Sequence, residues 1–316
     1  MTHTHGGGPL AALNGARPDA PKWFRDALAV PPERSMIETA GVRLESLAWG
    51  ERGKPGLLLM HGNGAHADWW SFIAPFFARD HRVVAFSWSG MGGSDWRSDG
   101  YSVDRYVDEA FGVAQAEGLF DAPVPPVFVG HSFGGFPTAA CAARHGERLR
   151  AAVIVDSPFR SPEQRKVRDA SRKPREHRPL REYASFEEAL VRFRFIPVQP
   201  CEHLFIVDHI ARTSLKPVTP ATPETAGHWT WRFDPYLWRD YRGGSPAKDL
   251  AGPKCPVALV WGGRSSLLPP EVVDYMRATV PAGSPGIEIP DADHHVWIDQ
   301  PLAFVAALRG LLAGWP

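Results

Sequence analysis

A serine flanked by glycines stands where an apolar run gives way to a helical pattern. The stretch Val127–Gly135 has the sequence VFVGHSFGG and contains a G-x-S-x-G centred on Ser132. In this setting the serine sits on a sharp strand-to-helix turn with its hydroxyl projecting outward, and the glycines leave room for the strained backbone. The start of the following helix favours negative charge that develops beside it. The motif predicts that Ser132 is a nucleophile; the alternative is a glycine-rich turn that carries a surface serine.

Most of the chain alternates short apolar runs with helical patterns. Strands are predicted over seven runs bounded by glycine or proline: residues 43–49, 57–60, 83–87, 127–130, 153–156, 257–261 and 287–289. Helices are predicted over residues 67–78, 103–116, 135–144, 270–279 and 301–313, with a short one within 21–30. This alternation is typical of an α/β fold with a doubly wound, mostly parallel sheet.

The alternation stops between residues 158 and 250. This stretch is rich in aromatic residues and interrupted by prolines, and it is too long to be a loop. We therefore expect an inserted, mainly helical cap over residues 158–250. Residues 1–20 are rich in glycine, alanine and proline, which predicts a flexible N-terminus. Residues 21–157 and 251–316 would then form the core.

A second motif follows the predicted strand at residues 57–60, where the chain continues as His-Gly-Asn-Gly. Alone, it is also compatible with an ordinary glycine-rich loop. Together with the motif around Ser132 it resembles the α/β-hydrolase superfamily, and the resemblance extends over nearly the whole chain. In that superfamily this loop supplies a donor to the oxyanion. The resemblance therefore implies that the backbone N–H groups of Asn63 and Phe133 would bind the developing oxyanion.

Two further segments carry the resemblance. The sequence FSWSGMGGS at residues 86–94 is similar to the family's D-x-x-G-x-G-x-S loop, with Ser87 in place of the usual, structural Asp. The sequence DHHVWIDQP at residues 293–301 is similar to the family's histidine loop, which leads into the last helix. Counting back from the proline with the family's spacing identifies His294 as the base, with His295 as the alternative.

The acidic member of the expected triad is where this chain departs from the family. After the predicted strand at 257–261 the family has an Asp, whereas Ser265 occupies that position here. A hydroxyl can hold an imidazole but cannot offset its positive charge as a carboxylate does. The superfamily has a second location for the acid, at the end of the strand after the nucleophile helix, and Asp156 stands there. Asp156 is the predicted acid; Asp293 and Asp234 remain alternatives.

The resemblance implies two-step acyl transfer. His294 would take the proton of Ser132, Ser132 would attack a carbonyl carbon, and water activated by His294 would release the acyl-enzyme. This chemistry needs neither a metal ion nor an organic cofactor, and we expect none.

Several aromatic residues are candidates for the substrate pocket. Trp229 and Trp231 belong to the expected cap, and Trp69 lies close in sequence to the oxyanion loop. His61 is included because it directly precedes that loop, although the family counterparts of His61 and His131 shape the loop and the turn at the serine. Packing of the cap against the core is the commoner use of such aromatic residues.

A basic run covers residues 160–181, with nine Lys or Arg against three Asp or Glu. Such a run is usually a solvated face. A more specific hypothesis is that one arginine, of which Arg160 is an example, enters the pocket to bind a substrate carboxylate.

Composition excludes several partner classes. Lys+Arg and Asp+Glu both total 35, so no overall field attracts the chain to nucleic acid or to an anionic membrane. The three cysteines are far apart, which predicts neither a disulfide framework nor a zinc site. No signal-peptide pattern or bilayer-spanning apolar segment is present in the sequence. We expect a cytoplasmic monomer or homodimer that acts on a small molecule.

These patterns favour a hydrolase of carboxylic esters, amides or related acyl compounds. Carbon–carbon bond hydrolysis and acyl transfer to an alcohol are alternatives within the same fold. Haloalkane dehalogenases and epoxide hydrolases place Asp where Ser132 stands, which disfavours both activities. A non-catalytic, ligand-binding member of the fold is the alternative from a different functional class.

Overall fold

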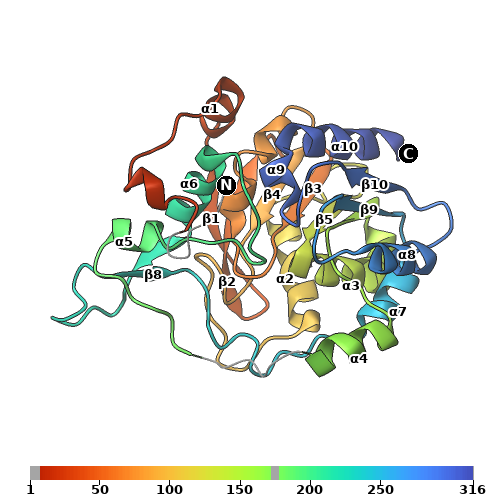
Figure 1. Cartoon of the computed structure of the whole chain (residues 1–316). Helices are drawn as coiled ribbons and strands as arrows, with labels where there is room; N and C mark the ends of the chain where they lie inside the picture. Colours follow the sequence, from red (N-terminus) through yellow and green to blue (C-terminus); the bar gives the residue numbers. More distant parts are fainter. Residues whose placement is uncertain (1–7, 172–177, 316) are drawn as a thin grey trace.

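The computed structural model describes residues 8–171 and 178–315 and contains one large central sheet (Figure 1). The order of its eight strands is β1-β2-β4-β3-β5-β6-β9-β10, and from β4 to β10 neighbouring strands are parallel. Strands β1 and β2 join the edge in antiparallel pairing. The strands are β1 (Glu33–Thr39), β2 (Val42–Trp49), β3 (Gly56–Met60), β4 (Arg82–Phe86), β5 (Val127–His131), β6 (Ala151–Val155), β9 (Val257–Gly262) and β10 (Gly286–Ile289). The predicted α/β-hydrolase fold, with its mostly parallel, doubly wound sheet, is confirmed.

The sheet is covered on both faces because alternate residues of the buried strands point in opposite directions. In β3, Leu57 and Leu59 join an apolar cluster with residues of α1 (Lys22–Leu28) and α10 (Pro301–Gly314). Leu58 and Met60 join a second cluster, built with α2 (Val103–Ala116) and α3 (Gly135–His145). A third cluster contains residues of α3 and of α8 (Pro270–Thr279). Two-sided burial explains why these strands are continuous apolar runs in the sequence.

Two parts of the expected secondary structure differ in the structure. The helix predicted over residues 67–78 is replaced by two short 3-10 helices, Ala67–Trp70 and Ala74–Phe76. Pro75 has no N–H to donate to the carbonyl of Ser71, so a continuous helix cannot form there. Strand β1 was not predicted, because this edge strand is mostly exposed and lacks an apolar pattern.

The segment 158–250 follows β6 and returns to the core before β9. It contains α4 (Pro162–Ser171), α5 (Phe186–Leu190) and α6 (Leu204–Thr213), together with a small antiparallel pair, β7 (Leu215–Pro217) and β8 (Trp229–Trp231). A last helix, α7 (Pro246–Ala251), begins in the segment and ends one residue beyond it. Much of the rest is irregular. The β7–β8 pair and the irregular stretches were not anticipated by the prediction of a mainly helical insertion.

The predicted flexible N-terminus lies partly outside the described residues, since residues 1–7 are not described. Residues 8–20 pack against the 158–250 segment. Leu10 is 1% exposed, the N–H of Gly8 donates to the carbonyl of Val191 at 3.0 Å, and Arg212 donates to the carbonyl of Gly15 at 2.7 Å. The composition of this stretch, which is rich in glycine, did not predict that Leu10 would be buried.

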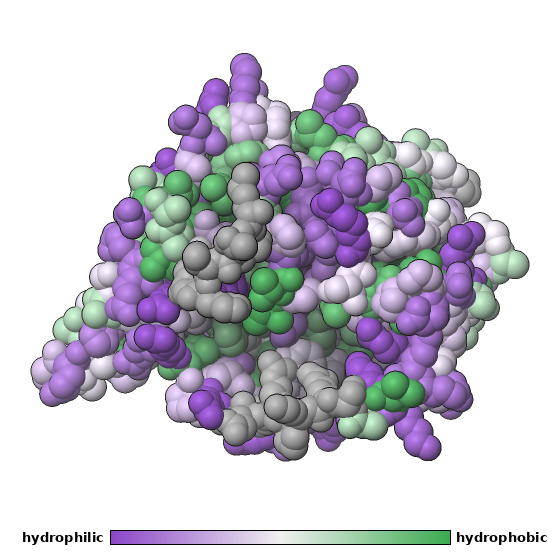
Figure 2. Space-filling model, in the orientation of Figure 1, coloured by the Kyte–Doolittle hydropathy of each residue, from purple (hydrophilic) through white to green (hydrophobic). Residues whose placement is uncertain are grey.

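Polar and apolar residues are interspersed on the face shown in Figure 2, with hydrophobic residues in small separate patches. None of the described helices is both long and apolar enough to cross a bilayer.

Candidate active site

Ser132 lies on a tight turn between β5 and α3. Its φ of 52° is in the left-handed region, which is strained for a residue with a side chain. The glycines on either side are required by close packing: a Cβ on Gly130 would lie 2.0 Å from Thr138 Oγ1, and one on Gly134 would lie 2.6 Å from the carbonyl oxygen of His61. The predicted strand–turn–helix setting of the motif is therefore present, and Ser132 itself is partly exposed.

The loop after β10 carries His294 to Ser132. His294 Nε2 lies 2.8 Å from Ser132 Oγ, and His294 Nδ1 lies 2.6 Å from Asp156 Oδ1. With Nδ1–H donating to the carboxylate, Nε2 has the lone pair that accepts the serine O–H. The structure thus brings the three predicted residues together in one hydrogen-bonded chain, although their side chains come from the ends of different strands.

Asp156 is held by donors other than the histidine. It follows β6 with a φ of 44°. Its Oδ1 accepts the hydroxyl of Ser265 at 2.7 Å, and its Oδ2 accepts the N–H of Gly262 at 2.9 Å. Ser265, which occupies the family's usual acid position, therefore donates to the carboxylate that approaches from the neighbouring strand.

The two alternative acids, Asp234 and Asp293, have other partners than His294. The carboxylate of Asp234 accepts the hydroxyl of Tyr101 at 2.7 Å and the N–H of Tyr236 at 2.8 Å. The carboxylate of Asp293 lies 3.7 Å from the guanidinium of Arg264. In the described part of the chain, neither carboxylate forms a hydrogen bond with His294, whose ring contacts Asp156 and Ser132.

The two predicted oxyanion donors flank the serine. Gly62 packs so closely that a Cβ there would lie 3.0 Å from Ser132 Cβ, which places the Asn63 loop beside the hydroxyl. Among the described residues, no hydrogen bond uses the backbone N–H of Asn63 or of Phe133. Trp238 spans both residues: its Nε1–H donates to Asn63 Oδ1 at 2.9 Å, and its ring packs edge-on against Phe133 with centroids 5.1 Å apart.

Two cavities of about 260 Å³ each adjoin these residues. Asn63, Trp69 and Trp231 line the first cavity. Phe133 and Arg160 line the second, and Trp238 lines both.

Two predicted pocket residues are not among the residues that line either cavity. His61 is fully buried and holds the loop after β4: the N–H of Trp88 donates to its Nε2 at 3.1 Å, and its Nδ1–H donates to the carbonyl of Gly62 at 2.7 Å. Burial lowers the pKa of His61 to about 3. The ring of Trp229 packs against Phe186 at 4.9 Å within the 158–250 segment.

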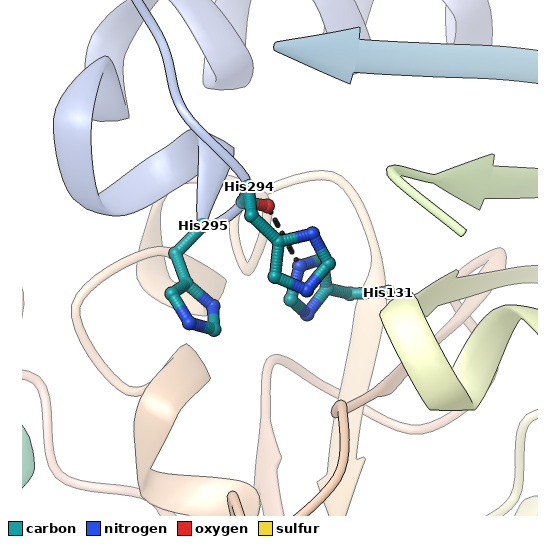
Figure 3. Close-up of side chains that lie close together, drawn as sticks. All are labelled: His131, His294 and His295. Carbon is teal, nitrogen blue, oxygen red and sulfur yellow. Dashed lines mark hydrogen bonds between the residues drawn. The ribbon is translucent and has the colours of Figure 1, made fainter. Parts of the chain in front are cut away.

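Three histidines cluster together, and one of them is the His294 that contacts Ser132. Figure 3 shows the rings of His131, His294 and His295 close together, with His131 Nε2–H donating to the carbonyl of His294 at 2.9 Å. Burial lowers the pKa of His131 and of His295 well below the usual value, so both are uncharged. Among the described residues, these three histidines are the one group of three or more potential metal ligands that lie close enough together to share an ion.

Gln199 supports the histidine loop, a role that no pattern in the sequence predicts. Gln199 Oε1 accepts the N–H of His295 at 3.0 Å, and its Nε2–H donates to Asp299 at 2.9 Å. Asp299 also accepts the N–H of Asp293 at 2.7 Å. Gln199 lies in an irregular, proline-flanked stretch with no periodic pattern, so no sequence signal connected it with the loop.

Comparison with known proteins assigns the family. The Alpha/beta hydrolase family matches residues 57–308. A 2-hydroxymuconate semialdehyde hydrolase from Pseudomonas sp. (strain CF600) is 37% identical over 105 residues, which span 32% of this chain and only 36% of that protein. Epoxide hydrolase 3 from Xenopus tropicalis is 24% identical over 329 aligned positions, covering 96% of this chain and 84% of that protein.

The solved structures show the same fold at low sequence identity. The crystal structure of E-2-(acetamidomethylene)succinate hydrolase superposes with a TM-score of 0.71 and 17% identity, covering 90% of this chain and all of that one. The matched family spans most of the chain, and the two relatives described above are hydrolases by name. The chain belongs to the α/β hydrolase family and is a hydrolase.

Proposed function

We propose that the protein is a serine hydrolase that cleaves small carboxylic esters, amides or related acyl compounds through an acyl-enzyme. The observation that carries this proposal is the continuous chain from Ser132 Oγ to His294 Nε2, at 2.8 Å, and from His294 Nδ1 to Asp156, at 2.6 Å. A serine hydroxyl is a weak nucleophile until a base accepts its proton, and that base needs a third group to orient it.

In the proposed mechanism Ser132 is the nucleophile, His294 the general base and Asp156 the orienting acid. As Oγ attacks the carbonyl carbon, its proton passes to His294 Nε2 and the carboxylate stabilises the imidazolium. The uncommitted N–H groups of Asn63 and Phe133 bind the oxyanion. His294 then gives this proton to the leaving group. It next takes a proton from water, whose oxygen attacks the acyl carbon, and returns that proton to Ser132 Oγ as the acyl-enzyme is hydrolysed.

The segment 158–250 is proposed to be the cap that forms the substrate pocket. Its residues Trp231 and Trp238 line the first cavity together with Trp69 of the core. Aromatic walls of this kind suit the apolar part of an acyl substrate. The core then supplies the reacting groups, and the insertion shapes the space that selects the substrate.

A fluorophosphonate probe tests the proposed function directly, because it reacts with activated serines. Intact-mass analysis is expected to show one adduct on the wild-type chain and none on a folded Ser132→Ala variant. No adduct on folded wild-type protein would contradict the activated serine and favour a ligand-binding protein. Hydrolysis that survives Ser132→Ala would move the reaction to another group.

The charge of the second cavity suggests the kind of ester to try. Arg160 donates to the carbonyls of Leu267 at 2.9 Å and Pro158 at 3.3 Å, and it forms no ion pair with another described residue. Burial lowers the pKa of this guanidinium, and the nearby Arg168 adds to the effect. A substrate carboxylate would offset a half-buried cation that is already held in place by two carbonyls.

We therefore expect p-nitrophenyl hemisuccinate to be preferred over p-nitrophenyl butyrate, its uncharged counterpart. Arg160→Gln should lower kcat/KM for the hemisuccinate by about tenfold to a hundredfold, as the loss of a hydrogen bond to a charged group implies. Steady-state kinetics with both esters measures this change, and the butyrate reports any general damage. Equal losses for both esters would show that Arg160 only supports the fold.

A further inference from the structure

The three clustered histidines place three ring nitrogens around one small space. The ring centroids of His131 and His294 are 4.7 Å apart, those of His294 and His295 4.8 Å, and those of His131 and His295 5.3 Å. One nitrogen from each ring lies within 4.8 Å of the other two. Figure 3 shows that His131 comes from the end of β5, whereas the other two come from the loop before α9 (Val296–Asp299).

Each ring has a lone pair to offer. His131 uses Nε2–H to donate to the carbonyl of His294, which leaves its Nδ1 as an acceptor, and this buried atom has no hydrogen-bond partner. Neither buried nitrogen of His295 has a well-formed hydrogen bond, although the backbone of Ile196 lies close enough to one of them to accept its N–H weakly. His294 uses Nδ1–H for Asp156, so that the lone pair on its Nε2 is the one engaged by Ser132.

Such unpartnered nitrogens are unusual in a protein interior, where buried polar groups are nearly always satisfied. The surroundings offer aromatic rings instead. Trp69 and Phe195 pack against His295 with centroids 5.3 and 5.0 Å away, and Trp297 packs against His131 at 4.5 Å. With one N–H of His295 directed to the backbone of Ile196, the other nitrogen of His295 and Nδ1 of His131 keep lone pairs that these aromatic rings do not engage. A ligand that accepts electron pairs would be stabilised there.

The spacing requires only a small adjustment for an ion. Three atoms no more than 4.8 Å apart all lie within roughly 2.8 Å of a common centre, and a Zn–N bond is about 2.0–2.1 Å, so a shift of roughly 0.7 Å per ring completes three bonds. Trp69 and Phe195 line the first cavity as well as contacting His295. These two rings therefore separate the histidine cluster from the first cavity.

We propose that His131, His294 and His295 bind a divalent first-row transition ion, and that this ion inhibits the enzyme. Three imidazole nitrogens suit Cu²⁺, Ni²⁺ and Zn²⁺ and disfavour Mg²⁺ and Ca²⁺, which prefer oxygen ligands. The ion competes with the hydroxyl of Ser132 for the lone pair on His294 Nε2. While bound, it deprives the serine of its base. The inhibition rests on the proposed function, whereas the binding does not.

The binding test uses Cu²⁺ and electron paramagnetic resonance, which reports nitrogen ligands through their hyperfine splitting. All proteins in this test carry His3→Ala and His5→Ala, because histidines close to the amino terminus bind Cu²⁺ themselves. The parent is expected to bind one ion with three nitrogen ligands, and the ion should quench tryptophan fluorescence, since Trp297 and Trp69 contact the cluster.

His295→Phe should weaken Cu²⁺ and Zn²⁺ binding at least about 100-fold, because even outer-shell partners of metal ligands are worth 10–100-fold. His131→Asn is a second variant, which is needed if the phenylalanine ring in His295→Phe disturbs folding. The matched control is His228→Phe, which changes a histidine between β7 and β8 and should leave binding unchanged. Unaltered affinity in folded His295→Phe and His131→Asn would overturn the proposal.

Labelling separates this proposal from the proposed function. Zn²⁺ should slow fluorophosphonate labelling of the parent but not of His295→Phe, and excess chelator should restore the rate. A three-nitrogen Cu²⁺ spectrum in a protein that is never labelled would uphold the ion site and contradict the serine hydrolase. Normal labelling that is insensitive to bound Zn²⁺ would contradict the inhibition.

Discussion

Asp156→Asn is expected to lower kcat for ester hydrolysis by about 10⁴-fold, the loss that follows when a histidine is held in the wrong tautomer. In the native site the carboxylate accepts three hydrogen bonds, from His294 Nδ1, Ser265 Oγ and the N–H of Gly262. An amide of the same shape can keep some of these bonds. Its NH₂ group, however, cannot accept from Nδ1–H, and no charge remains to offset the imidazolium. Stopped-flow or steady-state hydrolysis of a p-nitrophenyl ester measures the loss.

Ser265→Ala is the matched control for this substitution. It removes one of the three donors to Asp156 but leaves the carboxylate bonded to His294 and to Gly262. We expect kcat to fall by no more than about tenfold, because that factor corresponds to the free energy of one ordinary hydrogen bond. Small losses in both variants would mean that another acid orients His294. Asp293→Asn would then be the substitution to examine, because Asp293 directly precedes the histidine.

Local patterns carried most of the information about the core and the reacting residues. Buried strands such as β3 are continuous apolar runs in the sequence, and the glycines around Ser132 are there because no side chain fits at those positions. His294 follows from its spacing to Pro301, and Asp156 was considered because Ser265 occupies the usual acid position. The structure brings these residues together, while their catalytic roles remain proposals.

The features that local patterns did not reveal depend on long-range contacts. His61 directly precedes Gly62 and Asn63, but its side chain turns into the core, where Trp88 donates to it. Trp229 and Trp231 are two residues apart in β8, and only Trp231 lines the first cavity. In a strand, neighbouring side chains alternate and every second one shares a face, so the different surroundings of these two tryptophans come from the uneven packing of the 158–250 segment.

Gln199 illustrates the same limit. It connects the 158–250 segment to the histidine loop through the N–H of His295 and the carboxylate of Asp299. Gln199 is 96 residues from His295 and 100 residues from Asp299 along the chain. No periodicity or motif encodes such a pairing, and a single sequence contains no record of which distant residue it meets.

Arg97→Met is expected to destabilise the fold by about 3–5 kcal/mol, the cost of leaving one partner of a buried ion pair alone. Arg97 and Glu109 have side chains that are 3% and 0% exposed, with Arg97 Nη2 2.9 Å from Glu109 Oε1. The carboxylate also accepts the N–H and the hydroxyl of Ser89, in the loop after β4. Burial raises the pKa of Glu109 despite these bonds, so removal of the guanidinium leaves a charge with insufficient compensation.

The pH dependence of that loss distinguishes a buried charge from simple loss of packing. Without Arg97 the pKa of Glu109 in the folded state should rise further above its unfolded value. A raised carboxyl pKa contributes stability below the unfolded value, and this contribution is lost as the pH rises through the folded value. The loss of unfolding free energy in Arg97→Met relative to wild type should therefore be larger at pH 8 than at pH 5, as measured by urea unfolding.

The control is Arg239→Met, which breaks an ion pair whose side chains are 65% and 71% exposed. It should cost less than about 1 kcal/mol at both pH values. A deficit for Arg97→Met that is independent of pH would mean that Glu109 is not the source of the cost.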